Sequence, residues 1–143
     1  MIRRVGALAA AGLLLSACGS TSATSALRQW SSQSDFASAL STVRDDARHA
    51  VEQLHVVPTS ASALHTVCAV LAFDVEQAQA SLPTPDAQTT NLLSRAYSRF
   101  LVGANECYQA SAPSRSRALA TLEQAGATLA EAAARLRAST GGV

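Results

Sequence analysis

The chain has 143 residues, of which 48% are hydrophobic and only 4% aromatic, and its formal net charge is +1. This length suits one compact domain and leaves no room for a second. A nucleic-acid partner would require a clustered basic face. With 11 basic and 10 acidic residues there is no such excess, so we expect no nucleic acid to bind.

The first nineteen residues have the pattern of an export signal. Arg3 and Arg4 form a basic start, an apolar run covers Val5–Leu15, and small residues precede Cys18. The apolar run has eleven residues, whereas a transmembrane helix needs about 20. The pattern therefore predicts a signal peptide over residues 1–17 that is cleaved, not a membrane span.

The stretch Leu15-Ser16-Ala17-Cys18 resembles the lipobox of bacterial lipoproteins. The abundance of alanine and the absence of lysine also resemble the composition of actinobacterial proteins. This resemblance implies a diacylglyceryl group on Cys18, which anchors a protein stably because it carries two acyl chains. It also implies a location at the extracytoplasmic face of the cell membrane. The alternative is an ordinary signal peptide with an incidental cysteine.

Residues 18–33 are rich in serine and threonine and show little apolar periodicity. We therefore predict a flexible tether that follows the lipidated cysteine. Trp30 is the exception in this stretch, because its ring has a large apolar area to bury. We expect it to fold onto the domain, with the membrane interface as the alternative position.

From residue 34 to residue 139, apolar side chains recur every three or four positions in four runs. This spacing is typical of amphipathic helices. The first run covers Phe36–Leu54, with Ser32 or Ser34 as its candidate N-cap. The second covers Leu64–Leu82, with Thr59 or Ser60 as its candidate N-cap.

The third run ends at Cys107 and the fourth covers Leu119–Leu136. We place the start of the third helix near Thr89 or Thr90, after a connection that includes Thr84-Pro85-Asp86. Four helices with short links most economically form an up-and-down four-helix bundle. The predicted fold class is therefore all-α, with the bundle over residues 34–139 and a short tail over residues 140–143.

Small residues shape the expected core. Alanine is frequent in all four runs, and Gly103 and Gly126 fall within the third and the fourth. Small side chains allow helices to approach closely but bury little apolar area. We therefore expect a thin core that needs a covalent staple.

Cys68 and Cys107 lie on the apolar stripes of the second and third runs. An exported protein with two cysteines usually pairs them, so we predict one inter-helix disulfide. It would stabilise the fold by about 4 kcal/mol in the chain-entropy model. The alternative is two buried free thiols. There is no Cys-x-x-Cys spacing, which favours a structural bond over a catalytic one.

The sequence contains no pattern of catalytic residues. The histidines His49, His55 and His65 are not spaced from one another as two metal ligands on one helix face, and no nucleophile turn or phosphate loop is present. Asp45, His49 and Glu52 share a face, for which a solvated surface with ion pairs is favoured over a weak metal site. We therefore expect no enzyme activity, cofactor or metal.

These features predict a non-catalytic binding or adaptor module, held at the membrane through Cys18 and partnered by an envelope protein. The alternative is a carrier of an apolar ligand, either lipid or haem, in the bundle core. Four aromatic residues would then line the cavity, although we expect them simply to fill the core: Phe73, Tyr97, Phe100 and Tyr108.

Overall fold

The computed structural model describes residues 19–33, 35–56, 60–109 and 111–140. Over these ranges the chain forms five α-helices and no strand, which confirms the all-α fold class. The helices are α1 (Gly19–Gln33), α2 (Phe36–His55), α3 (Ala61–Gln79), α4 (Ala87–Tyr108) and α5 (Ala112–Thr140). Helices α2 to α5 correspond to the four predicted runs, and α1 is additional.

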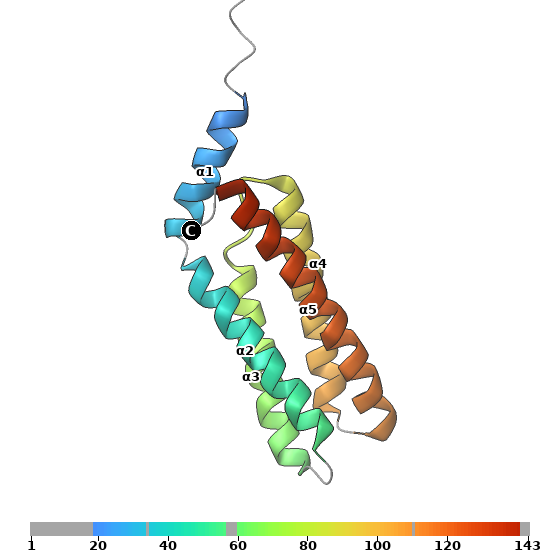
Figure 1. The fold of residues 1–143 in the computed structure, drawn as a ribbon. Helices are drawn as coiled ribbons and strands as arrows, with labels where there is room; N and C mark the ends of the chain where they lie inside the picture. Colours follow the sequence, from blue (N-terminus) through green and yellow to red (C-terminus); the bar gives the residue numbers. More distant parts are fainter. Residues whose placement is uncertain (1–18, 34, 57–59, 110, 141–143) are drawn as a thin grey trace, which may run out of the picture.

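Helices α2 to α5 lie side by side, and α1 continues beyond one end of this group (Figure 1). Along the chain α3 runs opposite to α2, α4 opposite to α3, and α5 opposite to α4. The interface between α4 and α5 is the most extensive, followed by α3 with α4 and α2 with α3. The contact between α2 and α5 is much smaller, so this side of the molecule is the least closely packed.

The prediction of a flexible tether is wrong for Gly19–Gln33, which form α1. Leu27 is only 2% exposed, and the Trp30 ring lies 4.8 Å from the ring of Phe36, measured between centroids. Burying these apolar side chains stabilises a helix that a serine-rich composition alone would not favour. The expectation that Trp30 folds onto the domain is confirmed. The proposed signal peptide and Cys18 lie outside the described residues.

The predicted helix caps are confirmed in one case and wrong in another. The hydroxyl of Ser60 accepts a hydrogen bond from the backbone N–H of Ala63 at 3.1 Å, and it is the N-cap of α3. For α2 the N-cap is Asp35, in the left-handed region with φ 45°, and its side chain makes no capping bond. Ser32 instead belongs to α1. Ser34 and Thr59 lie outside the described residues.

Helix α4 begins slightly earlier than predicted, at Ala87 rather than near Thr89 or Thr90. The reason is Asp86, whose carboxylate accepts the backbone N–H of Thr89 at 2.9 Å and so caps the helix. The connection Ala80–Asp86 lets α4 extend past the end of α3. The two helices are thereby offset along their axes, as a bond between Cys68 and Cys107 requires.

The predicted disulfide between Cys68 of α3 and Cys107 of α4 is confirmed, with Cα atoms 5.9 Å apart. Both cysteines are at most 1% exposed. This Cα separation is ordinary for a disulfide. The bond therefore joins the two helices within the core and not at its edge.

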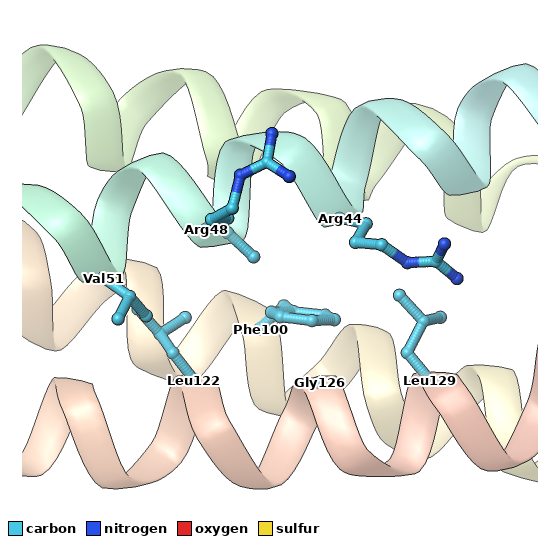
Figure 2. Close-up of a pocket in the computed structure, with 8 residues that line it drawn as sticks. Arg44, Arg48, Val51, Phe100, Leu122, Gly126 and Leu129 are labelled. Carbon is cyan, nitrogen blue, oxygen red and sulfur yellow. The ribbon is translucent and has the colours of Figure 1, made fainter.

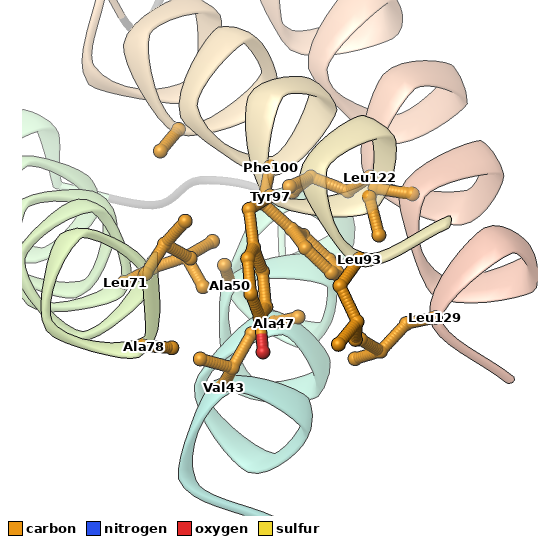
Figure 3. Close-up of a cluster of buried hydrophobic side chains, with 14 of the residues drawn as sticks. Val43, Ala47, Ala50, Leu71, Ala78, Leu93, Tyr97, Phe100, Leu122 and Leu129 are labelled. Carbon is orange, nitrogen blue, oxygen red and sulfur yellow. The ribbon is translucent and has the colours of Figure 1, made fainter. Parts of the chain in front are cut away.

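Tyr97 and Phe100 of α4 lie in the middle of the core (Figure 3) and are at most 1% exposed. Leucine, valine and alanine side chains of the neighbouring helices surround them. Two of the four aromatic residues therefore fill the core as expected. The other two do not, because Phe73 is 60% exposed and Tyr108 is 48% exposed.

Candidate functional site

Large apolar side chains are exposed on α3 and α4. Phe73 of α3 and Val102 and Tyr108 of α4 are 60%, 53% and 48% exposed, and we call these three residues, with the groove between their helices, the α3/α4 face. Val70 of α3 is also exposed. Several exposed apolar side chains on neighbouring helices are typical of a protein interaction site.

The groove of the α3/α4 face has a volume of about 310 Å³. Phe73 and Val102 directly follow two of its lining residues in the sequence. At one end the Tyr108 ring stacks on the ring of His65, with centroids 4.3 Å apart. The lining consists of Cys68, Ala69, Ala72, Glu76, Leu101, Ala104, Asn105 and Tyr108.

A second, smaller pocket of about 210 Å³ lies between α2 and α5, and we call it the Phe100 pocket. Figure 2 shows the Phe100 ring, which comes from α4, between the ribbons of α2 and α5. Arg44 and Leu129 lie on one side of this ring, and Arg48, Val51 and Leu122 lie on the other. Ala47 and Gly126 complete the lining.

The two arginines of the Phe100 pocket differ in their partners. Arg48 is 3.0 Å from the Asp45 carboxylate and 3.9 Å from that of Glu52. Arg44 forms none of the ion pairs found within the described ranges. The expected ion-paired surface is thus confirmed for Asp45 and Glu52. Among the described residues no three His, Cys, Asp or Glu side chains gather as a metal site would require.

A third pocket, of about 530 Å³, lies where α1 meets the start of α2 and the end of α5. Arg28 and Thr140 both line it, and Nε of Arg28 donates a hydrogen bond to the Thr140 carbonyl at 2.9 Å. This bond ties α1 to the end of α5. The pocket therefore belongs to the junction that holds α1 against the other helices.

Two carboxyl groups meet between α2 and α3. Burial of Asp46, its hydrogen bond with Asp74 and the negative charge of Asp74 raise the pKa of Asp46 to about 6. One carboxylate oxygen of Asp46 is buried and has no hydrogen-bond partner among the described residues. Sequence reasoning missed this pair, because nothing in the spacing along α2 indicates which residue of α3 faces Asp46.

The carboxylate of Asp86 faces a cation, in contrast to that of Asp46, which faces another carboxyl group. Arg135 of α5 donates to it from Nε at 2.9 Å and from Nη2 at 3.2 Å. These bonds and those from Thr89 hold the pKa of the Asp86 carboxyl well below its ordinary value. Asp86 therefore stays ionised and links the start of α4 to the second half of α5.

Tyr97 is the remaining ionisable group in the core. Its ring is fully buried, and its hydroxyl has no hydrogen-bond partner in the described part of the chain. Burial raises the pKa of Tyr97 to about 12. The side chain is therefore neutral at physiological pH.

No protein-family model, curated protein or solved structure matches this chain. None of the five described helices has the length and apolar character that a membrane span needs.

Proposed function

We propose that this chain is a lipid-anchored lipoprotein that acts as a non-catalytic adaptor at the extracytoplasmic face of the cell membrane. The lipobox-like residues that end at Cys18 support the anchor. The Cys68–Cys107 disulfide supports an exported location, because disulfides persist in oxidising compartments. The alternating directions of α2 to α5 support a four-helix up-and-down bundle as the adaptor domain.

The observation that carries the adaptor role is the α3/α4 face. Phe73 of α3 and Val102 and Tyr108 of α4 present apolar surface to solvent, and Tyr108 also lines the groove between the two helices. Alanines line much of this groove, so it has room for the side chains of a partner. The occupant that fits this arrangement best is the apolar face of a helix from an envelope protein.

The position of the α3/α4 face also suits an adaptor. The disulfide holds α3 and α4 together beneath the groove, so little conformational entropy is lost when a partner binds. Helix α1 begins at Gly19, directly after Cys18, and projects from the end of the other helices. An anchor on Cys18 would leave the α3/α4 face free to contact a neighbouring protein.

A carrier of lipid or haem is the second proposal that the sequence raised, and the geometry favours it less. A carrier buries most of its ligand, typically in a cavity of at least about 300 Å³. The groove of the α3/α4 face has about this volume, but it lies between two helices, and several of its lining side chains, Tyr108 among them, are exposed. This shape suits the side chains of a partner protein better than an enclosed ligand.

Site-specific crosslinking tests the adaptor role. A photoreactive amino acid at position 73 should trap one discrete protein in native membranes, whereas the same probe at Glu131, exposed on α5, should not. The trapped protein should also co-purify with the wild-type chain and be lost from Val102→Ser, because serine removes apolar contact area. Equal trapping from both positions, or none from either, would contradict the adaptor proposal.

The anchor has its own test. Cys18→Ala should leave the chain unprocessed or release it from membranes, and an intact mass of the wild-type protein should show cleavage before Cys18 and added acyl groups. Finding Cys18→Ala cleaved and still bound to membranes would rule out lipidation as the means of attachment. The crosslinking result alone would then test the adaptor proposal.

A further inference from the structure

The Phe100 pocket is separate from the α3/α4 face and differs from it in charge. Its walls come from α2 and α5, and its floor is an aromatic ring of α4. Phe100, Leu122 and Leu129 are each at most 2% exposed. The pocket therefore reaches side chains of the core, and a bound group would contact an apolar floor.

Gly126 keeps this pocket open. A Cβ atom built at Gly126 has no atom within 4 Å, so packing does not require glycine at this position. Glycine is also less favourable than alanine inside a helix. What Gly126 contributes instead is space, and it lies in the wall of α5 that faces Arg44 and Ala47 of α2.

The charge at the pocket comes from arginine alone. The lining includes Arg44 and Arg48 and contains no aspartate or glutamate. Arg48 is engaged by Asp45 and Glu52, whereas Arg44 forms none of the ion pairs of the described residues. Arg44 is thus a guanidinium beside an apolar pocket, and no carboxylate of the described residues lies within ion-pair distance of it. A carboxylate matches its donor geometry, because the two groups can form paired hydrogen bonds.

The volume limits what the pocket can hold. An apolar cavity of about 150 Å³ accepts a benzene ring, whereas pockets for larger ligands begin near 300 Å³. At about 210 Å³ the pocket has room for one aromatic ring or one branched alkyl group. A lipid or a haem would exceed it.

We propose that the Phe100 pocket binds a small apolar carboxylate, with its ring or alkyl group over Phe100 and its carboxylate paired with Arg44. This site stands independently of the adaptor role, because it shares no residue with the α3/α4 face. The bound class comprises aryl-acetic and branched short-chain carboxylic acids.

Titration of the full chain with phenylacetate tests this site, followed by the NMR signals of the Leu122 and Leu129 methyl groups. Phenylacetate should shift both signals in a saturable way. Phenylacetamide has the same ring without the charge, and it should bind at least about tenfold more weakly because charge-assisted bonds to arginine are lost. Equal affinity for the two probes, or no saturable shift with phenylacetate, would overturn the proposal.

Two variants separate the charge from the cavity. Arg44→Gln should weaken phenylacetate binding about tenfold, whereas the matched control Arg95→Gln, on the exposed side of α4, should leave binding unchanged. Gly126→Leu should abolish binding because the added side chain occupies the pocket. An Arg44→Gln chain that binds as the wild type does, or an Arg95→Gln chain that is equally weakened, would overturn the assignment. Arg44 is exposed, so this result does not depend on whether Gly126→Leu folds.

Discussion

Helix α5 contacts α4 along one side and α2 along the other, and each contact contains one glycine. At Gly103 of α4, an added Cβ atom would lie 2.7 Å from Cδ2 and 2.9 Å from Cγ of Leu122. At Gly126 of α5, an added Cβ atom would have no atom within 4 Å. The same residue type therefore allows close approach in the first contact and leaves open space in the second.

Polar contacts follow the same division. Arg135 binds Asp86 across α4 and α5, and Glu106 of α4 accepts hydrogen bonds from Arg117 and Thr121 of α5 at 3.2 and 3.0 Å. These contacts lie at different levels along the two helices.

Among the described residues, the side-chain hydrogen bonds between α2 and α5 lie at one end of the two helices. There Arg115 of α5 donates to the carbonyls of Leu54 and Val56 at 3.2 and 2.9 Å. We infer that the α4 side of α5 provides stability and the α2 side provides room for a ligand.

The largest loss of stability should come from removing the Cys68–Cys107 disulfide, which joins α3 to α4 of the closely packed α4/α5 pair. A Cys68→Ala, Cys107→Ala double variant should lose about 4 kcal/mol of stability in the chain-entropy model. Thermal unfolding by circular dichroism measures the change, with the reduced wild-type chain as the matched control. A melting temperature unchanged from the oxidised wild type would show that helix packing alone sustains the domain.

Gly103→Ala should break the close contact between α4 and α5. The added methyl group must displace Leu122, which is only 2% exposed, and overpacking of a core costs about 1–3 kcal/mol. Alanine recovers part of this through its higher helix propensity, so we expect a net loss of about 1 kcal/mol. Denaturant unfolding gives the value, and an increase in stability would mean that Leu122 moves aside freely.

Asp46→Asn should remove a pH dependence that arises between α2 and α3. The pKa of Asp46 is about 6 in the folded chain and near 3.8 when unfolded, so the folded state holds the proton more tightly. Wild-type stability should therefore fall as pH rises from about 4 to about 6 and stay lower above that range. Solvent screening limits the size of this change in stability, because Asp46 is only partly buried.

The variant should accordingly melt at a higher temperature than the wild type at pH 7.5 and lose this advantage near pH 4. Glu123→Gln removes the same charge from the exposed surface of α5 and should leave the pH profile unchanged. Parallel profiles for Asp46→Asn and the wild type would show that the Asp46–Asp74 contact does not shift the titration.

The smallest expected effect has the opposite sign. Gly126→Ala should raise stability by about 0.5–1 kcal/mol, because alanine favours the helix and its methyl group meets no atom. Comparing Gly126→Ala with Gly103→Ala in the same denaturant experiment separates the effect of packing on stability from the effect of helix propensity. A loss of stability from both variants would remove the distinction between the two sides of α5.

The sequence predicted most of the helical structure and the disulfide. The apolar stripes of α2 to α5 are local patterns, because residues three or four apart share a helix face whatever the partner is. Cys68 and Cys107 lie on two such stripes, and both are buried. Pairing followed from the presence of only two cysteines after Cys18.

The tertiary structure alone decided the remaining features. The composition of Gly19–Gln33 did not predict α1, because this helix depends on burying Leu27 and Trp30 in the core that it shares with the other helices. Asp46 and Asp74 share no local pattern, and they meet only because α2 and α3 pack with one particular rotation.

The roles of Gly103 and Gly126 also depended on tertiary packing. The sequence predicts close approach at both positions, yet only Gly103 faces a side chain within contact distance. Periodicity along a chain determines which face of a helix is apolar. How far apart two apolar faces lie depends on side chains of both helices at once, so the Phe100 pocket is visible only in the folded structure.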